Sequence, residues 1–119
     1  AKTAYQDVKQ IASGELAAEA WYYDAYFKNK EQDFEASNES VQKLAKDYAA
    51  YKEWAGKGLV IMAKNFYNLG DAFQATYILE SVISNFAEFE EIVSDAKSEL
   101  ATIKAKEAES NSSVDPNEN

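Results

Sequence analysis

The chain has 119 residues and a mass of 13.3 kDa, which is the size of one ordinary domain. It carries 12 lysines against 21 acidic residues, so its formal net charge is −9. Histidine, cysteine and arginine are absent, which excludes thiol and imidazole chemistry, His/Cys zinc sites and bidentate arginine–phosphate contacts. The acidic balance argues against nucleic-acid binding, and no apolar run approaches the ~18 residues of a membrane span.

Apolar residues recur at helical spacing along most of the chain, and only one Pro and four Gly interrupt it, which predicts an all-α protein. Gly14 and Gly70 are typical of helix ends, and Asp71 with Gln74 resembles a capping box. The Ser/Asn-rich residues 110–119 predict a disordered tail. Short connections predict antiparallel neighbours. We expect helices over roughly 2–13, 16–30, 33–48, 52–69, 71–86 and 89–107.

The sequence also repeats itself. When Ala17 is placed over Gly56, an offset of 39, four identical pairs align at equivalent points of two helical hairpins. These pairs are Phe27/Phe66, Asn29/Asn68, Phe34/Phe73 and Ala36/Ala75. The spacing of apolar residues in the second helix of a hairpin recurs at the very start of the chain, at Ala1, Tyr5 and Val8. The chain is therefore expected to begin within a repeat and to be part of a longer protein.

The stretch 56–86 resembles a tetratricopeptide repeat (TPR). Its matching positions are Met62, Ala63, Phe66, Gly70, Asp71, Phe73, Ala75, Leu79 and Val82. The stretch 17–48 is a weaker copy, which departs at Asp24, where the family has a small residue, and at Glu31, where glycine is usual. The resemblance implies antiparallel helical hairpins stacked as a right-handed solenoid. A plain helical bundle is the alternative.

On this interpretation a TPR-like domain covers residues 1–109. It consists of a half repeat (1–14), two repeats (15–50 and 51–87) and a capping helix (88–109), before the tail at 110–119. The resemblance is closest to bacterial repeat proteins, including those of the periplasm and outer membrane. A cytoplasmic location is the alternative, since any export signal would lie upstream of residue 1.

Carboxylates are the first candidates for chemistry. The cluster Glu88, Glu90, Glu91 and Asp95 could supply oxygen ligands to a hard cation, but no twelve-residue calcium loop is present, and acidic residues are favoured near a helix N-terminus. Glu15 and Glu19 lie one turn apart, as in di-iron bundles, yet those sites also need histidine. We therefore expect no metal site and no cofactor.

Asp24 is the strongest acid/base candidate, because a carboxyl buried at a small-residue position would have a raised pKa. The favoured alternative is a structural role, with the carboxylate hydrogen-bonded to a tyrosine or reaching water. Most of the many aromatic residues are expected in the core. Trp21 and Tyr22 lie off the apolar stripe, and they are better candidates for a binding surface, including a platform for sugars.

The leading functional hypothesis is a non-catalytic module that binds another protein, an expectation that rests mainly on the family resemblance. The alternative is a structural spacer or a self-association segment, in which the first helix pairs through its apolar stripe of Tyr5, Val8 and Ile11. A small helical enzyme or ligand carrier is the third hypothesis.

The resemblance places the binding face on the first helix of each pair. From the first copy it includes Trp21, Ala25, Lys28 and Asn29, and from the second Lys57, Val60, Lys64, Tyr67 and Asn68. Three lysines would make this strip locally positive, suited to a peptide with acidic and aromatic or aliphatic groups. Lys64 and Asn68 also resemble the carboxylate-binding pair of chaperone-type repeats. Alternatively, the lysines are only solvated, and the C-terminal helix or a missing repeat fills the groove.

Overall fold

The computed structural model describes residues 14–113, and within this range the chain is helical, with no strand. The helices are α2 (Glu15–Lys30), α3 (Phe34–Asp47), α4 (Lys52–Asn68), α5 (Ala72–Asn85) and α6 (Glu90–Ser113). The all-α prediction is confirmed for these residues, and each helix lies close to a predicted one. The helix predicted over 2–13, with its apolar stripe, lies outside the described residues.

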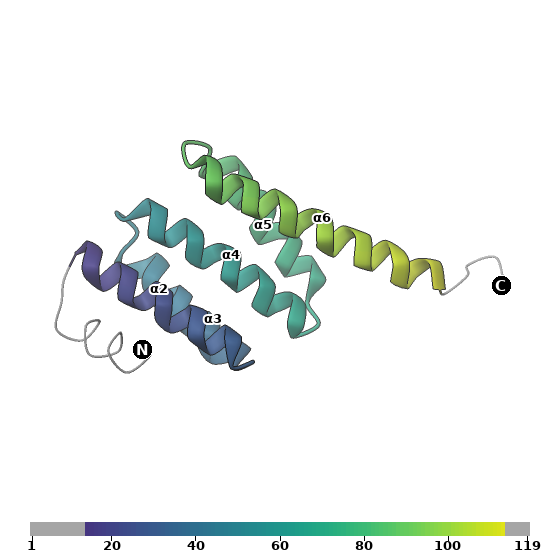
Figure 1. Cartoon of the computed structure of the whole chain (residues 1–119), viewed down its shortest axis with the longest axis horizontal. Helices are drawn as coiled ribbons and strands as arrows, with labels where there is room; N and C mark the ends of the chain where they lie inside the picture. Colours follow the sequence, from purple (N-terminus) through teal and green to yellow (C-terminus); the bar gives the residue numbers. More distant parts are fainter. Residues whose placement is uncertain (1–13, 114–119) are drawn as a thin grey trace.

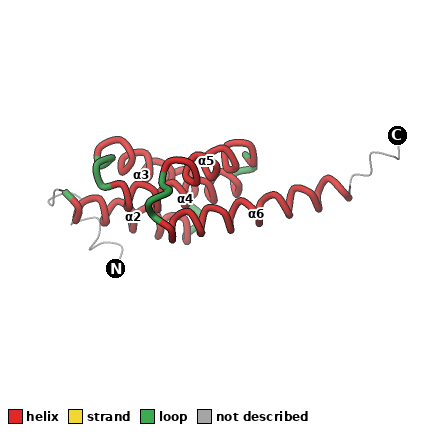
Figure 2. The backbone as a smooth tube through the Cα atoms, turned by 90° about the horizontal axis from the view of Figure 1, so that it is seen from above, coloured by secondary structure: helices red, strands yellow, loops and turns green. Residues whose placement is uncertain are grey.

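The helices pack in two layers. In Figure 1, α2, α4 and α6 lie side by side and run in the same direction, while α3 and α5 lie behind them; Figure 2 shows these layers from above. Each helix packs against the next along the chain, and α4 packs against α2 and α6 as well. α4 therefore contacts all four of the other described helices. This packing is consistent with a helical bundle.

The turn between α4 and α5 follows from two residues. Gly70 has φ +90°, a left-handed conformation that glycine adopts without a Cβ clash. The Asp71 carboxylate then accepts a hydrogen bond from the backbone N–H of Gln74 at 3.0 Å, which caps α5 as predicted. In the first hairpin, Gln32 has the left-handed φ of +66° and Asp33 is the N-cap residue of α3.

α6 is longer than the sequence predicts. It continues from the expected end at 107 to Ser113 and so includes the first residues of the predicted tail 110–119. No Gly or Pro occurs between Glu107 and Ser113, so nothing in the sequence ends the helix where its apolar pattern fades. Residues 114–119 lie outside the described part.

The bounds of the helices fit an offset of 38 rather than the predicted 39. α3 and α5 begin at Phe34 and Ala72 and end at Asp47 and Asn85, so both their ends are related by this offset. The ends of α2 and α4, at Lys30 and Asn68, are related in the same way. Buried residues follow the corrected offset too: Ala17/Ala55, Ala18/Gly56, Ala20/Gly58, Asp24/Met62, Ala25/Ala63, Ser37/Ala75, Val41/Leu79 and Leu44/Val82. The four identities that suggested 39 do not fall at equivalent positions.

The corrected offset changes the interpretation of the first copy. Ala25, rather than Asp24, occupies the position of Ala63, and both alanines are fully buried. Small residues at such positions let helices cross closely. A Cβ added to Gly56 would lie 2.8 Å from the Phe86 ring, and one added to Gly58 would lie 2.8 Å from Leu44. At these two positions of α4, any residue larger than glycine would force Phe86 or Leu44 to move.

Replacement of Ala63 by leucine should overpack this crossing. Ala63 belongs to the core cluster that includes Ala75 and Leu79, and we expect Ala63→Leu to lower the free energy of unfolding by about 1–3 kcal/mol. The matched control is Ala101→Leu, because Ala101 occupies the next equivalent position of the repeat, on α6, and is exposed. Urea unfolding followed by circular dichroism measures both; equal stability of the two variants would contradict this packing.

Candidate binding groove

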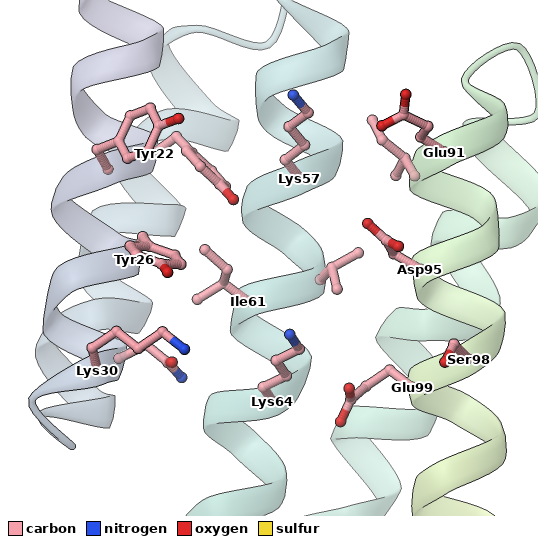
Figure 3. A pocket seen from close by; sticks show the side chains of 14 residues that line it. Tyr22, Tyr26, Lys30, Lys57, Ile61, Lys64, Glu91, Asp95, Ser98 and Glu99 are labelled. Atoms are coloured by element: carbon pink, nitrogen blue, oxygen red, sulfur yellow. The ribbon is translucent and has the colours of Figure 1, made fainter.

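A groove runs between α2 and α6, with α4 as its floor (Figure 3). Its cavity volume is about 480 Å³. An extension of about 420 Å³ lies toward the end of α4 and shares Asn29, Lys30, Lys64 and Glu99 with it. The groove therefore lies on the layer made by α2, α4 and α6, which includes the first helix of each pair, where a binding face is expected, and adds α6 as a wall.

The structure brings all five predicted second-copy residues to the groove or its extension. Lys57, Val60 and Lys64 line the groove, and Tyr67 and Asn68 line its extension. Tyr67 donates a hydrogen bond from Oη to Glu107 Oε2 at 3.1 Å, which ties α4 to α6. Asn68 donates from Nδ2 to the carbonyl of Lys64 at 2.8 Å, so this amide is directed along its own helix.

Three of the four predicted first-copy residues are misplaced. Asn29 lines the groove, but Trp21, Ala25 and Lys28 are not among the lining residues. Ala25 is fully buried against Val41 and Met62, and Lys28 contacts Asp24 and Ser40 instead. The cause is the offset error of one residue, which on a helix rotates the expected face by about 100°.

The residues that do form the α2 wall lie one position further along. They are Tyr22, Tyr23, Tyr26 and Lys30, with Asn29 between them. The Tyr22 ring lies 5.5 Å from the Trp54 ring and 6.4 Å from the Tyr26 ring, centroid to centroid. Burial raises the pKa of Tyr22, and Tyr23, Tyr26 and Asp95 shift it in the same direction. This hydroxyl is therefore neutral at pH 7.

The α6 wall is acidic, and two of its residues, Glu91 and Asp95, belong to the carboxylate cluster noted in the sequence, which does not indicate their place beside the groove. Glu91, Asp95 and Glu99 lie on successive turns of α6, and Figure 3 shows them on the side that faces α4. Within residues 14–110, none of the three forms an ion pair within 4.0 Å. The groove is therefore not simply positive, because a lysine- and tyrosine-bearing side is opposed by a row of carboxylates.

A buried polar cluster fixes the α2 wall to the floor. Asn65 is fully buried on α4, and its Oδ1 accepts a hydrogen bond from Asn29 Nδ2 at 2.8 Å. Asn65 Nδ2 donates to Ser37 Oγ at 2.8 Å and to Asn38 Oδ1 at 2.9 Å. Ser37 in turn donates to the carbonyl of Ala25 at 2.7 Å. One amide thus joins α2, α3 and α4, a role that a search for apolar periodicity overlooks.

Asp24 has a structural environment. Its carboxylate is fully buried, accepts a hydrogen bond from Ser40 Oγ and lies 2.9 Å from Lys28 Nζ. The predicted structural role is therefore supported, with a serine and a lysine among the partners of the carboxylate. A carboxylate enclosed in this way is not presented to a substrate in the groove.

Other kinds of site find no support among the described residues. Residues 14–113 bring together no group of three potential metal ligands, and Glu88, from the candidate cation cluster, pairs with Lys52 at 2.9 Å. That hydrogen bond is the main cause of the lowered pKa of Glu88. None of α2 to α6 combines the length and apolarity that crossing a bilayer requires.

Comparisons with known proteins add no identification: no family model matches the chain, and no curated protein or solved structure is significantly similar to it.

Loss of the Asn65 amide should destabilise the groove wall. Asn65→Ala would leave Asn29, Ser37 and Asn38 without their common partner, and we expect it to cost about 1–3 kcal/mol of folding free energy. Asn68→Ala is the matched control on the same helix; its side chain is exposed, so it should change stability by less than about 0.5 kcal/mol. Equal costs in chemical denaturation would show that the cluster does not stabilise the fold.

Proposed function

We propose that this chain is a non-catalytic, TPR-like helical repeat module that binds a segment of another protein. The observation that carries the proposal is the groove formed by α2, α4 and α6. Tyrosine rings, the apolar floor residues Val60 and Ile61, and charged groups of both signs line it. A long surface of this kind suits a polypeptide chain, which offers side chains and backbone polar groups along its length.

The repeated architecture supports the proposal. Helices α2–α3 and α4–α5 are two hairpins related by the offset of 38, and each helix packs against its next neighbour in sequence. The offset exceeds the period of about 34 residues of a standard TPR, so the module is TPR-like rather than a standard array. Ala25 and Ala63 provide the small residue at the same position of both first helices.

α6 has the character expected of the proposed capping helix, 88–109. Two positions that pack against the core on α4, Leu59 and Phe66, are equivalent to Lys97 and Lys104 on α6, and both lysines are exposed. A polar outer face is what a terminal helix of a solenoid needs for solubility. Two positions that are apolar and packed against the core on α4 are thus charged and exposed to water on α6.

Selection from a random peptide library on the immobilised protein tests the proposal. Selected peptides should lose affinity for Tyr26→Ala, which removes a ring from the groove wall, and should keep it for Tyr77→Ala, which removes an exposed ring from α5. We expect a loss of about tenfold, the effect of truncating an aromatic interface residue. Thermal unfolding confirms that both variants are folded.

Two outcomes would contradict a peptide-binding groove. One is the absence of any enriched peptide. The other is an equal loss of affinity for Tyr26→Ala and Tyr77→Ala, which would place binding elsewhere on the molecule.

A second candidate function, self-association, has one specific observation in its favour. Leu69, Phe73 and Tyr77 are exposed by 45%, 77% and 62%, and they recur at every fourth position from the α4–α5 turn into α5. Exposed apolar residues grouped in this way mark contact surfaces on other molecules. On this alternative the segment is a spacer whose copies pair through α5.

Light scattering over a range of protein concentrations distinguishes the two candidates. If the exposed stripe causes association, the parent should form dimers, and Phe73→Ser should shift the dissociation constant upward by about tenfold or more. Ala101→Ser, at an exposed position of α6 outside the stripe, is the control. A parent that stays monomeric at every concentration would argue against the spacer.

A further inference from the structure

The groove has walls of opposite character, and this asymmetry constrains its occupant. Glu91, Asp95 and Glu99 line the α6 side, while the lysines stand on α2 and α4 (Figure 3). Three lysines and three carboxylates line the groove, so net charge does not decide which partner fits. What decides is which charged groups already have partners within the protein.

Two of the three lysines are engaged. Lys57 Nζ lies 4.6 Å from the centroid of the Trp54 ring and 3.8 Å from a Glu53 carboxylate oxygen. Lys30 Nζ lies 5.2 Å from the centroid of the Tyr26 ring. These cation–π contacts hold the ammonium groups against the protein's own side chains. Only Lys64 among the three has no such contact within the described residues.

The carboxylates of the α6 wall lack such partners in the same part of the chain. The closest cations of the groove are more than 4.0 Å away, beyond ion-pair distance. The unpaired negative charge of the groove is therefore confined to one wall, whereas Lys57 is paired with Glu53, and Lys30 and Lys64 keep their positive charge on the opposite side. The expectation from the sequence considered the lysines alone and so suggested an acidic partner.

The spacing of the row indicates how a ligand would meet it. Residues 91, 95 and 99 are separated by four positions, or about 6 Å along a helix axis, and same-edge side chains of an extended chain recur every ~6.6 Å. An extended chain that lies along this row would therefore meet successive carboxylates with every second side chain.

We infer that the groove binds an extended peptide segment that presents a basic side chain to the α6 wall at every second position. The intervening side chains would lie over Tyr22 and Tyr26. This inference rests on the proposed peptide-binding function and specifies the chemistry of the partner. The net charge of −9 would add long-range attraction for such a segment, but only the wall would select the alternation.

The test is fluorescence anisotropy with three labelled synthetic peptides of equal length. In the first, lysine and threonine alternate; the second has the same composition with all lysines grouped at one end; in the third, glutamate and threonine alternate. We expect the first to bind most tightly. Glu99→Lys should weaken it by about five- to tenfold, while Glu39→Lys, an identical substitution on the exposed face of α3, should change affinity less than about twofold.

Lys64→Glu gives a prediction of opposite sign, because it replaces a positive charge of the groove floor by a negative one and should tighten binding of the alternating lysine peptide. Asp95→Lys repeats the wall test should Glu99→Lys fail to fold. Equal affinity for the first two peptides, preference for the glutamate peptide, or equal effects of Glu99→Lys and Glu39→Lys would each overturn the inference.

The peptide experiments also separate this inference from the proposed function. Library-selected peptides that depend on Tyr26 but carry no alternating basic residues would overturn the stated chemistry while leaving peptide binding intact. Failure of every selected and synthetic peptide to bind would instead refute the groove as a peptide site.

Discussion

α4 is surrounded by four other helices, and the arrangement of the whole domain follows from how it is accommodated. α3 and α5 cover its back, while α2 and α6 flank it. The helix meets this crowding with small residues, since Gly56 and Gly58 admit Phe86 and Leu44 where a Cβ would collide. Among residues 14–113, the strip of α4 between α2 and α6 is left uncovered. The groove is thus the face of α4 that no other described helix occupies.

The two sides of α4 are held by different chemistry at equivalent positions. Toward α2 and α3, Asn65 and Ser37 form buried hydrogen bonds; toward α5 and α6, the equivalent Ile103 and Ala75 pack in an apolar core. A buried polar group is costly unless every partner is in place, so the polar side tolerates few alternative packings. The apolar side contributes burial instead, which is non-directional. The contact of α4 with α2 and α3 is therefore fixed by directional hydrogen bonds, and the contact of α5 with α4 and α6 by apolar burial.

The helices could be predicted from the sequence because their ends carry local signals. Gly70 and Asp71 end one helix and begin another through backbone conformation and capping, which do not depend on the rest of the fold. The binding face could not be predicted in the same way. α2 carries aromatic residues on several sides, so apolar periodicity did not fix its orientation, and the chance identity of Phe27 with Phe66 favoured an offset of 39.

Contacts made by polar residues were the other source of error. The burial of Asn65 and Ser37 is invisible to a search for apolar stripes, and so is the pairing of Lys28 with Asp24, which removes that lysine from the groove. The acidic wall was missed for a related reason. Glu91 and Asp95 lie near the N-terminus of α6, where the helix dipole alone explains acidic residues, so their position beside the groove emerges only from the tertiary packing.

α6 thus combines two surfaces whose requirements differ. Its outer face needs only to be soluble, and exposed Lys97 and Lys104 meet that need without any geometric constraint. Its groove face must place charges at fixed spacing opposite α4. At physiological ionic strength charges are screened over about 8 Å, so most of the excess negative charge of the protein cannot distinguish one basic segment from another. Discrimination has to come from carboxylates close to the bound chain, which makes the local order of Glu91, Asp95 and Glu99 more informative than the net charge of −9.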